Sequence, residues 1–143
     1  MKILLVDPGT KETGFGIWED GAKSTWTVRT DPKEPLHERL KSIYASAAQH
    51  GPYERVVVES WERQFNPNMR YLIGCLHLLE CSEFKLVSPK KWRNDMFGTF
   101  VSKKAQPAAM KLAKQGHWNP KDQHQADAAC LWEWWNQHGK EES

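Results

Sequence analysis

Two short apolar runs that each end in a carboxylate constrain the fold of this chain more than any other feature. The first run, Ile3–Val6, is followed by Asp7, and the second, Val56–Val58, is followed by Glu59. Unbroken apolar runs of this length are typical of strands that are buried on both faces, as in parallel sheets. Because a buried carboxylate is costly unless something neutralises it, the pattern predicts a charged site at the ends of these strands.

The remaining elements follow from periodicity and from capping and turn residues. Further strands are predicted at 15–18, 25–28 and 84–87, and helices at 35–50, 68–81, 89–98, 102–115 and 122–138. With 143 residues, the chain is long enough for one domain with a core and too short for two ordinary ones. We therefore predict a single α/β domain over residues 1–139, with a mixed five-stranded sheet, helices on both faces, and a frayed tail at 140–143.

The helix predicted at 68–81 is apolar on more than one side. Such a helix either lies centrally in the core or divides its surface between the core and a subunit contact. No apolar run in the sequence is long enough to span a bilayer, and the three cysteines form no CxxC pair. We therefore expect an intracellular, cytoplasmic protein without a membrane segment.

A block of basic residues follows the second of the two acidic strand ends. Between Lys85 and Lys121 there are nine lysines and arginines and a single acid, Asp95, which gives a net charge of +8. The aromatic residues interleaved with this charge are Trp92, Phe97, Phe100 and Trp118. Charge runs are often simple solvated faces, but basic residues mixed with aromatics favour a surface that binds phosphates and stacks bases.

A third acidic element lies near the carboxyl end of the chain. His124 and Asp127 are three residues apart, so on a helix they share a face. If that helix crosses the sheet at the ends of the strands that close with Asp7 and Glu59, these two carboxylates meet the carboxylate of Asp127 and the imidazole of His124. Such a group favours Mg²⁺ or Mn²⁺ and suits metal-assisted cleavage of a phosphodiester.

Each of these residues also has an ordinary explanation. Asp7 could be only a turn residue before Pro8, and Glu59 could form an ion pair with Arg63. His124 and Asp127 could be exposed residues at the start of a helix. Their joint occurrence in this order favours the site.

The same segments resemble RuvC-type Holliday junction resolvases. The resemblance rests on residues 3–10 with 13–16, on Val57-Val58-Glu59 and on His124-Gln125-Ala126-Asp127-Ala128, and it extends to the basic stretches at 88–98 and 102–106. It implies an RNase H-like fold, a homodimer, Mg²⁺ dependence with Mn²⁺ able to substitute, and paired nicks across four-way DNA junctions. The chain is shorter than typical bacterial members, which is typical of a phage member acting in an infected host or of a divergent one.

The resemblance also implies roles for individual residues. It makes Asp7, Glu59, His124 and Asp127 the metal ligands and places Lys104 on a lysine important for catalysis. The residues implied in DNA contact are Lys90, Lys91, Arg93, Lys103 and Lys104, together with an aromatic at the junction centre, either Trp61 or Phe65. From the residues alone, Lys104 and Arg93 are both candidates for a cation beside the site.

Three other functions remain open from the sequence. An actin- or Hsp70-like phosphotransferase also has an Asp-x-Gly-Thr loop after its first strand, but it needs two domains to enclose a nucleotide. A small RNase H-like nuclease that processes ribosomal RNA is compatible with the position of Lys11. A DNA-binding module without catalysis is the third, although all four predicted metal positions are intact.

Overall fold

The computed structural model describes residues 1–61 and 66–139. The strands there are β1 (Lys2–Asp7), β2 (Glu12–Glu19), β3 (Ala22–Arg29), β4 (Tyr53–Glu59) and β5 (Cys81–Val87). The helices are α1 (Leu36–Ala48), α2 (Pro67–Leu76), α3 (Pro89–Phe97), α4 (Ser102–Gln115) and α5 (Gln123–Gln137). The predicted tail, 140–143, lies outside the described residues.

The five strands form one mixed sheet in the order β3-β2-β1-β4-β5. β1 is antiparallel to β2 and parallel to β4, and β4 is parallel to β5. In the central pair, Val6 lies opposite Val58, so Asp7 and Glu59 follow at the same edge of the sheet. Both the predicted sheet and the predicted adjacency of the two acidic strand ends are therefore confirmed.

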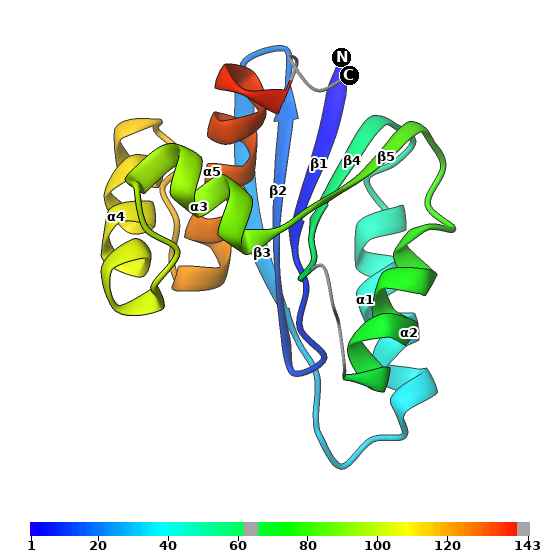
Figure 1. Cartoon of the computed structure of the whole chain (residues 1–143). Helices are drawn as coiled ribbons and strands as arrows, with labels where there is room; N and C mark the ends of the chain where they lie inside the picture. Colours follow the sequence, from blue (N-terminus) through cyan, green and yellow to red (C-terminus); the bar gives the residue numbers. More distant parts are fainter. Residues whose placement is uncertain (62–65, 140–143) are drawn as a thin grey trace.

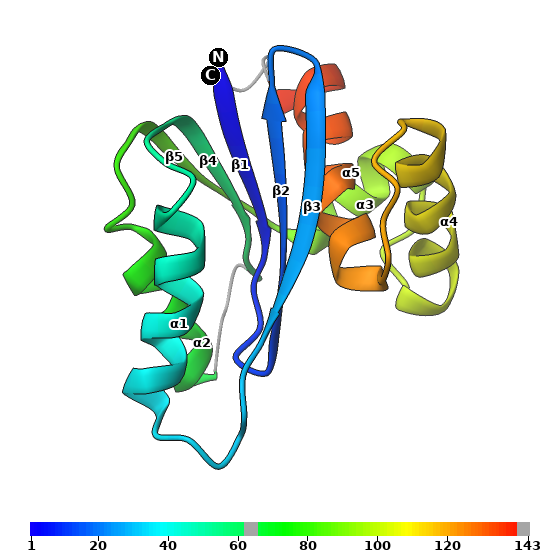
Figure 2. The same cartoon turned by 180° about the vertical axis from the view of Figure 1, so that it is seen from behind.

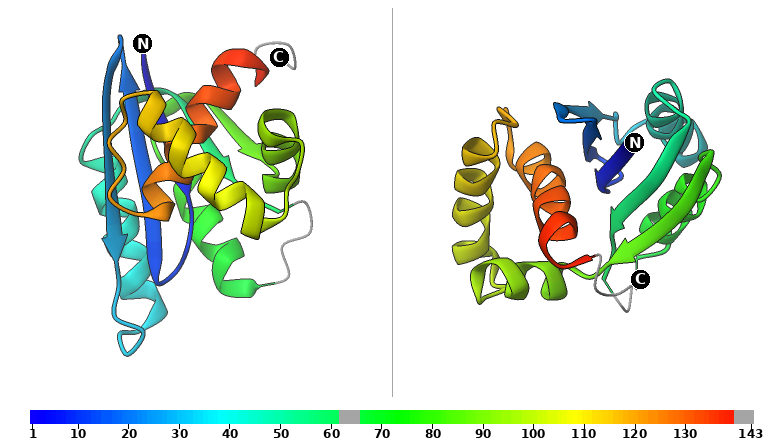
Figure 3. Two further views of the ribbon diagram at one scale, coloured as in Figure 1. Left: turned by 90° about the vertical axis from the view of Figure 1, so that its left-hand side faces the viewer. Right: turned by 90° about the horizontal axis from the view of Figure 1, so that it is seen from above.

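Helices cover both faces of the sheet. α1 and α2 lie on one face, and α3, α4 and α5 lie on the other (Figures 1 and 2). The view from above shows the sheet between these two helical layers (Figure 3). Successive residues of β1 point to opposite faces, so Leu4 and Val6 join one core while Ile3 and Leu5 join the other. This two-sided burial explains why the first strand is apolar without alternation.

The helix predicted at 68–81 is shorter than expected. α2 ends at Leu76, and by Cys81 the chain has entered β5, where Cys81 pairs with Tyr53 of β4. The apolar pattern continued past the end of the helix because Leu79 in the connection is also buried, whereas Leu78 is 73% exposed. Periodicity alone did not distinguish this buried turn from another turn of helix.

The prediction of an aromatic surface in the basic block was wrong for its two tryptophans. Trp92 is 0% exposed and Trp118 is 3% exposed, and both belong to the core on the α5 side of the sheet. Phe100, by contrast, is exposed. Large aromatic rings gain most from burial, and here the sheet and α5 offer a core to receive them.

Within residues 1–61 and 66–139, no helix combines the length and the apolar character that a membrane crossing requires.

Candidate metal centre

The position of α5 across the sheet depends on a cap and on a glycine. Asp122 is the N-cap residue; its Oδ1 accepts the backbone N–H of Gln125 at 2.9 Å, and its Oδ2 accepts the hydroxyl of Thr27 at 2.7 Å. In β2, a Cβ atom added to Gly14 would lie 2.3 Å from the carbonyl oxygen of His124. Only glycine lets the start of α5 approach the strand this closely.

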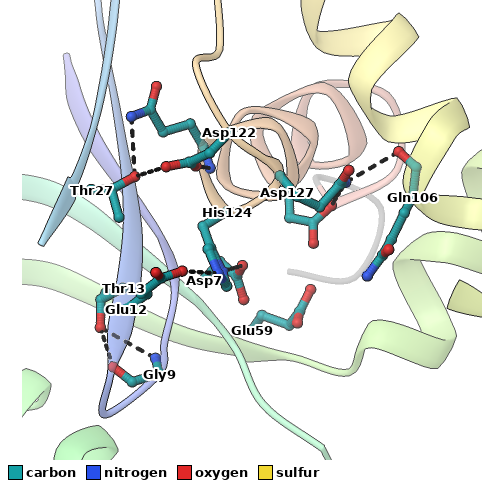
Figure 4. Close-up of polar contacts among 12 residues, drawn as sticks. Asp7, Gly9, Glu12, Thr13, Thr27, Glu59, Gln106, Asp122, His124 and Asp127 are labelled. Atoms are coloured by element: carbon teal, nitrogen blue, oxygen red, sulfur yellow. Dashed lines mark hydrogen bonds and ion pairs between the residues drawn. The ribbon is translucent and has the colours of Figure 1, made fainter. Parts of the chain in front are cut away.

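The four predicted site residues meet at this place. Figure 4 shows the side chains of Asp7, Glu59, His124 and Asp127, which come from β1, β4 and α5, directed toward a common space. His124 Nδ1 lies 3.1 Å from Asp7 Oδ2. The three carboxylate residues are buried, with exposed fractions of 9%, 9% and 5% in chain order.

Burial and the neighbouring negative charges raise the pKa of both Glu59 and Asp127. Burial raises the pKa of Glu59 well above its ordinary value, and the charges of Asp7 and Asp127 raise it further. Burial, followed by the charge of Asp7, raises the pKa of Asp127 to about 6. Positive charge near these two carboxylates favours their ionised form, and a bound cation would supply it.

Arg93 partly compensates the negative charge of the carboxylates. Its guanidinium lies 3.7 Å from Asp127 Oδ2, with only 8% of its side chain exposed, and it lowers the pKa of both Asp127 and Glu59. The indole N–H of Trp92 donates to Glu59 Oε2 at 2.7 Å, and Gln123 Nε2 donates to Asp127 Oδ1 at 2.9 Å. The structure thus places Arg93 with the carboxylates, where it is buried.

Glu12 also belongs to the site, although the sequence pattern did not predict it. His124 Nε2 lies 2.8 Å from Glu12 Oε2, so the imidazole bridges Glu12 and Asp7 (Figure 4). The hydrogen bond with Asp7 raises the pKa of His124 to about 9, and the charge of Glu12 contributes in the same direction. The sequence gives little indication of this role, because Glu12 does not end an apolar strand and has no acidic or histidine partner at helical spacing.

The donor set fits a hard divalent cation. In the described part of the chain, no group of three or more His, Cys, Asp or Glu side chains is arranged as a preformed metal centre. The imidazole instead lies beside Asp7 in an ion pair. The three carboxylates nevertheless form a buried, oxygen-rich group in which the pKa values of Glu59 and Asp127 are raised. Hard divalent cations such as Mg²⁺ and Mn²⁺ prefer oxygen ligands of this kind.

The other predicted site residues that the structure describes are exposed. Lys90 and Lys91 are exposed on α3, and Lys103 and Lys104 are exposed on the first turn of α4. Trp61 is 47% exposed and lines a cavity of about 260 Å³ together with Pro8, Glu59, Ser60 and Met69. Phe65 lies outside the described residues, so the choice between Trp61 and Phe65 stays open.

Comparison with known proteins identifies relatives over part of the sequence. No family model matches the chain. The crossover junction endodeoxyribonuclease RuvC of Acinetobacter baumannii is 38% identical over 81 residues, which cover 50% of this chain and 44% of that protein. The protein of the same name from Cupriavidus necator is 32% identical over 83 residues, covering 52% and 45%. The match thus spans less than half the length of these relatives.

Solved structures match over nearly the whole chain. Thermus thermophilus RuvC superposes with a TM-score of 0.70 at 20% identity and covers 97% of both chains. The fowlpox virus Holliday junction resolvase has a TM-score of 0.60 at 15% identity, with 93% of this chain and 96% of that chain covered. These likenesses confirm the predicted RNase H-like fold.

Proposed function

We propose that this chain, which is related in sequence and in fold to RuvC-type Holliday junction resolvases, is a metal-dependent endonuclease that nicks four-way DNA junctions. The observation that carries the proposal is the cluster of three buried carboxylates and one imidazole at the ends of β1 and β4 and the start of α5. The names of the curated relatives support the same reaction, and a Thermus thermophilus RuvC structure contains a Holliday junction substrate.

In this proposal, Asp7, Glu59, His124 and Asp127 hold one or two divalent cations. When bound, Mg²⁺ or Mn²⁺ supplies the Lewis acid for cleavage of the phosphodiester. The rest of the chain fixes these ligands: Trp92 holds one oxygen of Glu59, and Arg93 and Gln123 hold Asp127. Because Asp127 has both a cationic and an amide partner, the geometry of the cluster is maintained against the repulsion of its carboxylates.

DNA contacts belong in the proposal to exposed cations beside the cluster. Lys103 and Lys104 lie in the first turn of α4. Lys90 lies on α3, and its ammonium is 5.4 Å from the centre of the Phe100 ring. Exposed lysines bind phosphates through charge and do not need a fixed geometry. We assign Lys104 to the phosphate at the cleavage site, and either Trp61 or Phe65 to the centre of the junction.

A cleavage panel tests this function. We expect paired nicks in a synthetic four-way junction with Mg²⁺ or Mn²⁺, no cleavage with chelator, and little cleavage of a linear duplex. The panel also includes a Y-fork, a flap and an RNA–DNA hybrid, so that a preference for another branch or for RNA is seen directly. Fastest cleavage of the hybrid, or undiminished cleavage in chelator, contradicts the proposal.

We also propose that two copies of the chain act together. A four-way junction is two-fold symmetric and needs two cuts, whereas the described part of one chain contains one such cluster. On the face opposite α5, α1 and the end of α2 flank an open apolar pocket of about 270 Å³, which is lined by His37, Leu40, Lys41, Tyr44, Cys75 and Leu78. Leu78 in this lining and Tyr71 on α2 are both exposed, which makes this face suitable for an isologous contact.

The dimer predicts a specific effect of charge at Leu78. We expect the wild-type protein to sediment as a dimer at micromolar concentration and Leu78→Glu to sediment as a monomer, because a buried unpaired carboxylate opposes association. Leu86→Glu on β5 is the control, since Leu86 is also exposed and apolar but lies on the sheet edge. A wild-type monomer that stays monomeric on junction DNA contradicts paired cutting by a dimer.

A further inference from the structure

We propose that Glu12 is a positioning residue that holds the imidazole of His124 in the orientation needed to bind a divalent cation. This inference rests on the proposed function, because it assumes that the cluster of Asp7, Glu59, His124 and Asp127 binds metal. It extends that function by assigning a role to a side chain outside the four predicted ligands.

The contacts of the imidazole give its two nitrogens different roles. Nε2 lies 2.8 Å from Glu12 Oε2, on the side away from the other carboxylates, while Nδ1 lies 3.1 Å from Asp7 Oδ2 (Figure 4). Glu12 therefore occupies Nε2 and leaves Nδ1 directed at the cluster. A histidine that binds metal almost always donates its other ring N–H to an oxygen acceptor, and a carboxylate is a common one.

Glu12 is itself fixed by the neighbouring strand. It lies directly opposite Arg29 in the β2–β3 ladder, and Arg29 Nε is 3.3 Å from Glu12 Oε1. The two oxygens of Glu12 thus have separate partners, one on β3 and one on α5. This arrangement limits rotation of the carboxylate and so limits rotation of the imidazole.

The same arginine connects Glu12 to the start of α5. Arg29 Nη2 lies 3.2 Å from Oδ2 of Asp122, the residue that caps the helix carrying His124. Glu12, Arg29 and Asp122 therefore hold both the backbone and the ring of His124 relative to the sheet. Since exposed ion pairs contribute little to folding, we expect the loss of Glu12 to affect metal affinity more than stability.

Metal affinity of the purified full chain tests the proposal directly. Mn²⁺ binding is measured by the electron paramagnetic resonance signal of free Mn²⁺ during titration. We expect Glu12→Ala to weaken binding by about 10- to 100-fold, the usual effect of removing a carboxylate behind a metal-binding histidine. Glu12→Gln keeps an acceptor for Nε2–H and should recover most of the affinity. Glu19→Ala, at the far end of the same strand, removes the same charge and should bind as wild type.

A double-mutant cycle with His124→Ala separates positioning from a general loss of negative charge. In the His124→Ala background, Glu12→Ala should have no further effect, because the side chain that it positions is gone. An equal effect in both backgrounds, or wild-type affinity in Glu12→Ala, overturns the positioning role. In the latter case, a large loss in Asp7→Asn shows that the metal site itself stands. If neither the wild-type protein nor any variant binds Mn²⁺, the proposed function fails as well, and the inference with it.

Discussion

Asp7→Asn should slow cleavage of a four-way junction by at least about 10³-fold, while binding of the junction stays close to that of wild type. Asparagine has the same shape as aspartate but removes the charge that, in the proposed site, attracts a divalent cation. Asp7 is also the carboxylate that acts on all three of the other cluster residues, through its contact with His124 and its effect on the pKa values of Glu59 and Asp127. Single-turnover cleavage at saturating protein, with binding measured in Ca²⁺, checks both parts.

Asp20→Asn is the matched control for this variant. Asp20 lies in the turn between β2 and β3, where its carboxylate pairs with the amino group of Met1. Because its side chain is far more exposed than that of Asp7, the same chemical change there should leave cleavage unaffected. Wild-type cleavage by Asp7→Asn removes the carboxylate cluster from the mechanism. A loss of cleavage accompanied by an equal loss of junction binding assigns Asp7 to DNA binding.

Arg93→Met should lower the free energy of unfolding of the metal-free protein by about 3–5 kcal/mol at pH 7.5. The arginine is 7% exposed and is the cation that lowers the pKa of both Glu59 and Asp127. Methionine fills similar space without charge, which leaves the buried carboxylates without this compensation. Urea unfolding checks the loss, and Arg93→Lys, which keeps the charge, should lose less.

The loss of unfolding free energy in Arg93→Met should increase with pH. The pKa of Asp127 is raised from 3.8 to about 6 in the folded protein, so the folded state binds more protons than the unfolded state between these values. A group of this kind destabilises the folded state as pH rises through this window. Removing Arg93 raises the pKa values of Glu59 and Asp127 further. The stability difference between wild type and Arg93→Met should therefore be largest at pH 7.5 and small near pH 4.5. A deficit that is the same at both pH values contradicts the role of Arg93 as a counter-charge.

The sequence was sufficient for the parts of the fold that depend on local pattern. The continuous apolar run before Asp7 predicted a strand with two buried faces, and the capping residue Asp122 predicted the start of the last helix. The end of α2 was not predictable in this way. There, the apolar residues belong to a buried turn, and its limit is set by the pairing of Cys81 with Tyr53 on a different strand.

The same division applies to the residues around the site. Trp92 lies in the basic block and was predicted to be at the surface, yet its indole N–H is buried against Glu59. Arg93 was a candidate both for a DNA contact and for a cation beside the site. The structure places it against Asp127 with 8% of its side chain exposed. Burial of a single side chain depends on which surface packs over it, and composition does not contain that information.

By itself, the sequence determined that carboxylates end two buried strands and that His124 and Asp127 share a helix face, because these properties depend only on neighbours along the chain. The tertiary structure alone decided that Glu12 contacts His124 and that Arg93 contacts Asp127. These pairs are far apart in sequence. The first distance is fixed by the packing of α5 against β2, and the second by the packing of α3 against α5. No periodicity records such a distance, since it is a property of how separate segments meet.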